Sequence, residues 1–216
     1  SFAPHGLPNV KDLKVDFYAF SLYKTFGPHI GLLYGKEEIL SKLPNQNHEF
    51  LEGKIPYNIN PGGPNHEELV SIIGIYEYFM DLYNHHYDNN ATILEKISKI
   101  NNLISNHEEK IANLLLDYIN SKNEIKLIGK KQVEKKNRAP TISFTLDNMS
   151  SYNFSKLLVK DFIATRNDNF YAWRCLKALG IDTEDGVIRI SMTHYNSISE
   201  VEKLIKSIDG ILNNKN

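Results

Sequence analysis

Cysteine is nearly missing from this sequence, which contains only one, Cys175. A single thiol excludes an internal disulfide framework and fits a reducing compartment, so we expect a cytoplasmic protein. No apolar run approaches the roughly 20 residues that a membrane helix needs, and the first residues do not resemble a signal peptide. We therefore expect no association with a membrane.

The net charge is also close to zero, at −1 for the whole chain. Without a global basic field, neither nucleic acid nor an anionic membrane is an expected partner. The basic run 126–138 is local and is interpreted as a solvated loop between strands. The sequence also lacks a typical metal-binding motif. His85 and His86 are adjacent, but no second pair of ligand residues stands at metal-binding spacing from them, so no metal site is expected.

What the chain does contain is an ordinary globular composition. It has 216 residues, of which 41% are hydrophobic and 24% charged, enough to bury a substantial core. In its first part the pattern predicts strands at 17–20 and 29–35 and a helix at 37–43. The continuous apolar run Ile30–Tyr34 is typical of a strand covered on both faces of a sheet. The Pro/Gly/Asn-rich segment 44–63 is long for a loop, which favours a functional or interface role.

Two long helices are predicted next. The first, over 64–87, has a proline at its start and acidic residues in its first turn. The second, over 91–122, carries apolar residues at helical spacing and should bury one stripe.

From residue 125 the pattern changes to α+β. Strands are predicted at 125–128, 141–146 and 186–195, and helices at 150–161, 170–179 and 197–212. Ser197 and Glu200 have the spacing of a capping box at the start of the last helix. This order of elements suggests a small sandwich domain packed on a larger sheet.

Lys24 is the residue with the clearest chemical potential. It follows the apolar strand Asp16–Phe20 and precedes a Gly–Pro turn, a placement that fixes its position. A lysine amine at a strand end, if desolvated, loses its proton near neutral pH and attacks a carbonyl group. A hydroxyl at Ser21 could help to hold an anion such as phosphate. The alternative from local chemistry alone is an ordinary surface lysine.

Arg189 lies between two isoleucines in an expected strand in which residues 189, 191 and 193 share one face. Burying an arginine is expensive unless a carboxylate meets its planar fork. That carboxylate could belong to a substrate, or to an acidic residue of the same domain in an internal salt bridge.

Five segments in order along the chain resemble the class V aminotransferases, and within them most closely the cysteine desulfurase-like proteins. They are Val15–Gly35, Asn60–Glu67, Arg138–Phe144, Asn169–Ala172 and Ile188–Asn196. The resemblance implies an α/β protein of the fold type I of transferases that depend on pyridoxal 5'-phosphate (PLP). The chain would comprise the C-terminal part of the large-domain sheet, at 1–88, and a small C-terminal α+β domain, at 89–216.

The same resemblance implies the site residues. Lys24 would form the Schiff base with PLP, Ser21 would bind the cofactor phosphate, and Tyr23 could reach that phosphate through its hydroxyl. Gly63 stands where many relatives place a threonine that reaches the phosphate of the neighbouring subunit, and only its backbone N–H could do so. Ser1 aligns with a residue that contacts the cofactor ring oxygen.

On the substrate side, the resemblance makes Arg189 the residue that binds the α-carboxylate of an amino acid. Asn196 belongs to the same site and, with His194, would orient Arg189. Tyr171 stands where cysteine desulfurases carry the cysteine that accepts sulfur, and a phenol cannot form a persulfide. Cys175 lies one helical turn further on and is expected to be a small buried hydrophobe. The departure favours transaminase or β-lyase chemistry over desulfuration.

Family members are about twice as long as this chain and carry the lysine near the middle. The chain is therefore expected to be the C-terminal half of an enzyme that acts as a homodimer, with the rest of the cofactor site on a missing N-terminal half. The alternative is a catalytically inactive fragment or pseudoenzyme half.

Overall fold

The computed structural model describes residues 2–134 and 138–213 of the chain. The expected cofactor contact of Ser1, and Lys135 and Lys136 of the basic run, lie outside these residues. The described part divides into two compact units, residues 1–101 and 102–216, with the division inside helix α5 (Ile93–Asn120). The sequence suggested a boundary at 88/89 instead. The first turns of α5 belong to the first unit because the amide of Asn101 bonds the backbone N–H and C=O of Leu7, at 2.9 and 3.0 Å.

The first unit is built on a two-stranded antiparallel sheet and several short or medium-length helices. Strand β1 (Phe17–Ser21) pairs with β2 (Gly31–Gly35), so that Phe17 lies opposite Gly35. The helices are α1 (Val10–Leu13), α2 (Glu37–Leu40), α3 (His66–Ser71) and α4 (Ile73–His86), and short 3-10 helices lie at Ala3–His5, Leu22–Thr25, Glu49–Leu51 and Tyr57–Ile59. The last two fall in the segment 44–63 expected to be a loop.

Two expectations for the first unit were wrong. The helix over 64–87 is interrupted at Ile72, where N–H groups bond three residues back instead of four and tighten the turn. The strand β2 is not covered on both faces either: the side chain of Leu33 is 54% exposed and that of Leu32 37%. The physical reason is that β2 pairs only with β1 and that, within the described residues of this unit, its side chains have little to pack on.

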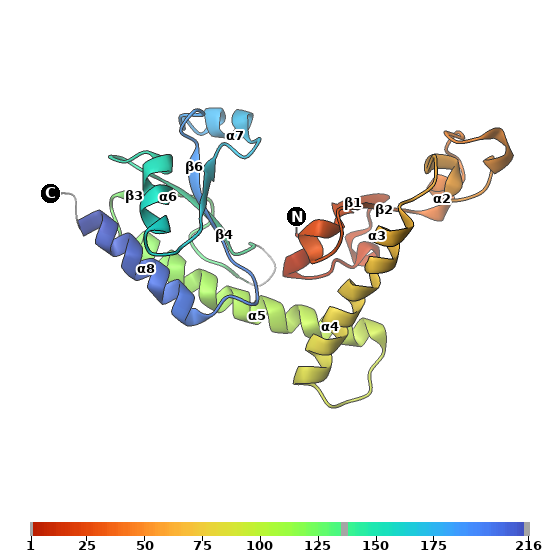
Figure 1. Cartoon of the computed structure of the whole chain (residues 1–216), viewed down its shortest axis with the longest axis horizontal. Coiled ribbons are helices and arrows are strands. Elements are labelled where there is room, and N and C mark those ends of the chain that lie inside the picture. The colour runs from red at the N-terminus through yellow and green to blue at the C-terminus, as the bar shows by residue number, and fades with distance from the viewer. Residues whose placement is uncertain (1, 135–137, 214–216) are drawn as a thin grey trace. The chain divides into compact units, whose positions relative to one another are not determined.

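The second unit is a four-stranded antiparallel sheet with helices packed on one face. The strand order is β3-β4-β6-β5, and every neighbouring pair is antiparallel. The strands are β3 (Ile125–Ile128), β4 (Thr141–Leu146), β5 (Arg166–Asp168) and β6 (Val187–Ser191), and the helices besides α5 are α6 (Ser151–Val159), α7 (Trp173–Ala178) and α8 (Ile198–Asn213). Figure 1 shows α5, α6 and α8 beside this sheet.

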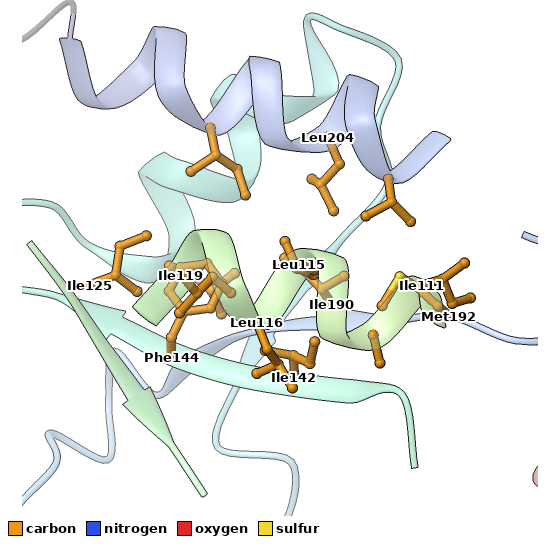
Figure 2. Close-up of a cluster of buried hydrophobic side chains, with 14 of the residues drawn as sticks. Ile111, Leu115, Leu116, Ile119, Ile125, Ile142, Phe144, Ile190, Met192 and Leu204 are labelled. Atoms are coloured by element: carbon orange, nitrogen blue, oxygen red, sulfur yellow. The ribbon is translucent and has the colours of Figure 1, made fainter. Parts of the chain in front are cut away.

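The core of the second unit lies between those three helices and the sheet. Ile142 and Phe144 of β4 and Ile190 of β6 point into it, as does the α5 stripe that ends at Ile119, and all are nearly inaccessible to water (Figure 2). The ring of Phe144 meets that of Phe154 of α6 edge-on, with centroids 5.8 Å apart. Because side chains alternate along a strand, the residues between these core positions lie on the opposite face of the sheet.

The expected elements of this unit are present, with three differences. The last strand ends at Ser191 rather than 195, and the three-residue β5 was not predicted. The helix expected over 170–179 begins only at Trp173, because Phe170 and Tyr171 have φ values of 53° and 61°, which a right-handed helix does not allow. The capping box is confirmed: Ser197 and Glu200 exchange hydrogen bonds at the start of α8, with the Ser197 N–H to Glu200 Oε2 distance at 2.7 Å.

Candidate functional site

Lys24 lies in the 3-10 helix Leu22–Thr25 that follows β1 directly. Its neighbours Leu22 and Thr25 are buried, with 3% and 1% of their surface exposed, so they anchor the turn from within. Lys24 itself is exposed. The described residues therefore fix the backbone of Lys24, while the residue itself lies at the surface.

The turn after Lys24 is held against α4. Phe26 has a left-handed backbone, with φ at 64°, and its ring packs on those of Tyr78 and Phe79 at 5.3 and 6.3 Å between centroids. A Cβ atom on Gly27 would lie 2.4 Å from Cδ1 of Ile75, so the backbone passes α4 at a distance that only glycine permits without a shift. Two aromatic contacts and one close approach thus determine where the lysine turn sits in the first unit.

Tyr23 and Ser21 flank Lys24 on the N-terminal side. The Tyr23 ring stacks on the imidazole of His29, 4.8 Å away and 7° from parallel, and the Lys24 Nζ lies 5.6 Å from the Tyr23 ring centroid. His29 thereby positions Tyr23. The Ser21 hydroxyl does not cap the 3-10 helix that begins after it.

Gly63 lies in the exposed loop before α3. A Cβ atom built on it would meet nothing within 4 Å, and its φ is not in the left-handed region, unlike the φ of 81° at Gly62. Neither packing nor backbone conformation therefore requires glycine at position 63.

Arg189 lies on β6, on the face of the sheet opposite the core, between Ser143 of β4 and Arg166 of β5. Its guanidinium carbon stands 3.9 Å from the ring centroid of Phe170, a cation–π distance. Its Nε is buried without a hydrogen-bond partner. Desolvation, and secondly the positive charge of Arg166, lower the pKa of Arg189.

The internal salt bridge considered for Arg189 is contradicted. Within the described residues no carboxylate is paired with it, and the recorded ion pairs join Lys36 to Asp16 and Lys122 to Asp209. A half-buried guanidinium with an orphaned Nε leaves room for a carboxylate supplied from outside the unit.

Asn196 shapes the turn that follows β6. Its Oδ1 accepts from the N–H of Thr193 at 2.9 Å, and its own backbone N–H donates to the Thr193 carbonyl at 3.0 Å. Its carbonyl oxygen lies 2.7 Å from Nε2 of His107 on α5. Hydrogen bonds from Ser197, and to a smaller extent the nearby Asn196 amide, lower the pKa of the Glu200 carboxyl. Because an NH₂ group has two donors, one N–H of Asn196 can still meet a ligand.

Tyr171 and Cys175 are both exposed, Tyr171 fully so, at 105%. The buried role expected for Cys175 was wrong, because α7 turns that residue to the surface. Tyr171 is not in α7 at all: it lies before the helix, and its N–H donates to Asn169 Oδ1 at 3.1 Å. The two residues therefore do not share a helix face.

Arg166 and Phe170 are the site residues that sequence reasoning missed. Arg166 lies on a strand of three residues, which gives too short an alternation to detect. Phe170 is positioned by a positive φ, which no pattern in the sequence marks.

The chain matches the family model of aminotransferase class-V over residues 1–204, nearly its whole length. The chain belongs to this family. Among curated relatives, the class V aminotransferase chain is 31% identical to "Aminotransferase-like protein FGM3" of Gibberella zeae over 98% of this chain and 50% of that one. It is 28% identical to "Cysteine desulfurase-like protein ustD" of Aspergillus flavus, over 97% of this chain and 45% of the relative.

Solved structures agree on the fold. The cysteine desulfurase CsdA of Escherichia coli superposes with a TM-score of 0.73 at 24% identity, over 99% of this chain and 50% of that one. The cysteine desulfurase of Thermococcus onnurineus gives 0.73 at 25% identity, over 97% and 50%. The expected fold is confirmed: this is α/β, with the fold type I arrangement of those proteins. The chain spans about half the length of the relatives it matches.

Two features are absent from the described residues. None of their helices combines the length and apolar character needed to cross a bilayer. Nor do three or more of their His, Cys, Asp and Glu side chains gather where they could hold a metal ion.

Proposed function

We propose that this class V aminotransferase chain carries the catalytic lysine and the substrate-binding arginine of a PLP-dependent enzyme that acts on an amino acid. The observation that carries the proposal is the placement of Lys24 on a turn locked by Phe26 and Gly27, within a chain that matches the family over 1–204. A surface lysine without a task would not need such a support.

The residues around Lys24 fit the cofactor. Lys24 carries the amine that would bind the aldehyde carbon, and the Ser21 hydroxyl, which caps no helix, can donate to a phosphate oxygen. Tyr23, held by His29, presents a second hydroxyl. The backbone N–H of Gly63 is proposed to reach the phosphate of a neighbouring subunit. When bound, PLP supplies an electron sink for a carbanion at the substrate α-carbon.

The chain's own residues then bind the substrate and move its proton. Arg189 binds the α-carboxylate through its planar fork, and Asn196 contributes one N–H of its side-chain amide to the same site. Lys24 would accept the α-proton as general base.

The reaction class follows from Tyr171. A phenol oxygen cannot accept sulfur from cysteine as a thiolate does, and Cys175 lies on a different element. We therefore favour transamination or β-elimination over desulfuration.

The whole protein is proposed to be a homodimer of a longer chain. Relatives are about twice as long, so the remaining contacts to PLP would come from a segment N-terminal to this one. A reducing, cytoplasmic setting suits the exposed thiol of Cys175.

The test is to reduce the protein with borohydride in the presence of PLP and to locate the pyridoxyl group by peptide mass spectrometry. We expect the label on Lys24. Lys24→Arg should abolish it, whereas Lys42→Arg, a change of another exposed lysine of the first unit, should not.

The experiment is run on the chain alone and on the chain joined to the N-terminal segment of its relatives. A label that appears only in the longer protein would show that this segment completes the site. If Lys24 stays unlabelled in both, the PLP assignment fails and the alternative of an inactive half gains support.

A further inference from the structure

Two arginines face each other on the open side of the second unit's sheet. Arg166 of β5 and Arg189 of β6 are direct cross-strand partners in the antiparallel pair. Partners of this kind have Cβ atoms about 4.5–5.5 Å apart and point to the same face, and like charges in this position are destabilising. An anion bound between them would relieve this repulsion.

The neighbouring side chains do not offset it. On the other side of Arg189 stands Ser143, a neutral residue. Asp168 is on the same face as Arg166, two residues along β5, and its Oδ1 accepts from the N–H of Asn169 at 2.6 Å, but it forms no ion pair with Arg166. No carboxylate of the described residues is paired with either arginine.

The pair is also held in place. The Phe170 ring supports the Arg189 guanidinium from one side. A Cβ atom on Gly186 would lie 2.3 Å from the carbonyl carbon of Asp168, so β5 passes the start of β6 at a distance open only to glycine. This close passage, at a φ of 69°, holds β5 and hence Arg166 beside Arg189.

We propose that Arg166 is a second anion-binding residue, and that the amino-acid substrate carries a second acidic group, as an amino dicarboxylate does. One guanidinium fork matches one carboxylate, so two adjacent forks match a ligand with two. A substrate with only an α-carboxylate would leave the charge of Arg166 uncompensated beside Arg189. The inference rests on the proposed function, because it assigns both charges to the substrate of that enzyme.

The test measures binding at the arginines themselves, without PLP. The chain contains Arg138, Arg166, Arg174 and Arg189, so its arginine Nε–Hε signals can be resolved by NMR after labelling with ¹⁵N-arginine. L-Aspartate and its neutral isostere L-asparagine are titrated in parallel. We expect aspartate to shift the signals of both Arg166 and Arg189 with one common Kd, roughly tenfold below that of asparagine, which corresponds to about 1.4 kcal/mol.

Variants separate the contributions. Arg166→Gln should raise the Kd of aspartate to that of asparagine and leave asparagine unchanged, and Arg166→Lys should restore part of the difference. Arg174→Gln is the matched control, since it removes one exposed positive charge from α7 of the same unit and should leave the preference intact.

The proposal is overturned if aspartate and asparagine bind alike, if neither moves the Arg166 signal, or if Arg166→Gln weakens both ligands equally. None of these results depends on the cofactor. If Lys24 is labelled but aspartate is not preferred, the second acidic group of the substrate is refuted and the proposed function is kept. If aspartate is preferred but Lys24 is not labelled, the proposed function is refuted and the anion-binding role of Arg166 is kept.

Discussion

The close approach of Gly27 to Ile75 makes a quantitative prediction about the support of the lysine turn. In Gly27→Ala the new Cβ would sit 2.4 Å from Cδ1 and 3.0 Å from Cγ1 of Ile75, and 3.2 Å from the Leu22 carbonyl oxygen. Because Ile75 is only 9% exposed, its side chain has little room to move away. Overpacking of this kind costs about 1–3 kcal/mol.

An opposing gain has to be subtracted. The φ of Gly27 is not in the left-handed region, so alanine is compatible with the backbone and reduces the entropy of the unfolded chain by about 0.4–1 kcal/mol. The net expected loss is therefore roughly 1–2 kcal/mol. Ile75→Val, which removes the Cδ1 atom, should by itself cost about 0.5–1.5 kcal/mol.

The double variant identifies the cause. With Cδ1 gone, the methyl group introduced at position 27 loses its shortest contact and keeps those at 3.0 and 3.2 Å, so the two changes should couple favourably by about 1 kcal/mol. The assay is native-state hydrogen exchange of peptides within 17–35, which reports on the first unit. A neutral Gly27→Ala, or strictly additive effects in the double variant, would refute the reasoning that this contact positions the Lys24 turn.

Two further predictions concern the second unit. Hydrogen bonds from the backbone and hydroxyl of Ser197 lower the pKa of Glu200, so the stabilising effect of this carboxylate is present above the unfolded pKa of about 4.3 and lost as pH falls through the lower folded value. Between pH 5 and 3 the melting temperature should therefore fall less steeply in Glu200→Gln than in the unmodified chain. Equal slopes would contradict this prediction. Tyr171→Gly should raise the free energy of unfolding by about 1 kcal/mol in urea titrations, because glycine relieves the φ of 61° and the exposed ring contributes no packing; a loss of stability would show that the Tyr171 side chain makes a contact of its own.

The local sequence patterns of the second unit predicted several of its elements. The helical stripe of α5 and the capping box of α8 are local signals, and both match the structure. The alternation in β4 places Ile142 and Phe144 in the core, where they are found. Such features depend on periodicity and on hydrogen bonds between residues that are close in the chain, and both can be recognised in the sequence.

The parts of the site that were missed depend on distant contacts or on backbone conformation. The facing of Arg166 and Arg189 arises from the register of β5 on β6, and a three-residue strand carries too few residues to indicate a register. The left-handed conformations of Phe170 and Tyr171 are unfavourable for those residues and follow from the surrounding structure. The exposure of β2 could not be predicted either, because its apolar sequence describes a covered strand.

The two chemical roles proposed for the chain differ in how far its own residues supply them. Arg189 has its support within the second unit: Phe170 beneath the guanidinium, Arg166 beside it, and no acid of the described residues to compete with a ligand. Lys24 has a fixed backbone and lies at the surface, next to a sheet whose apolar side chains Leu32 and Leu33 are also exposed. Leu32 and Leu33 point to opposite faces of β2, and a segment that covered either face would also lower the polarity around the lysine turn. Anion binding should therefore be measurable on this chain alone, whereas the base function of Lys24 should require the longer protein.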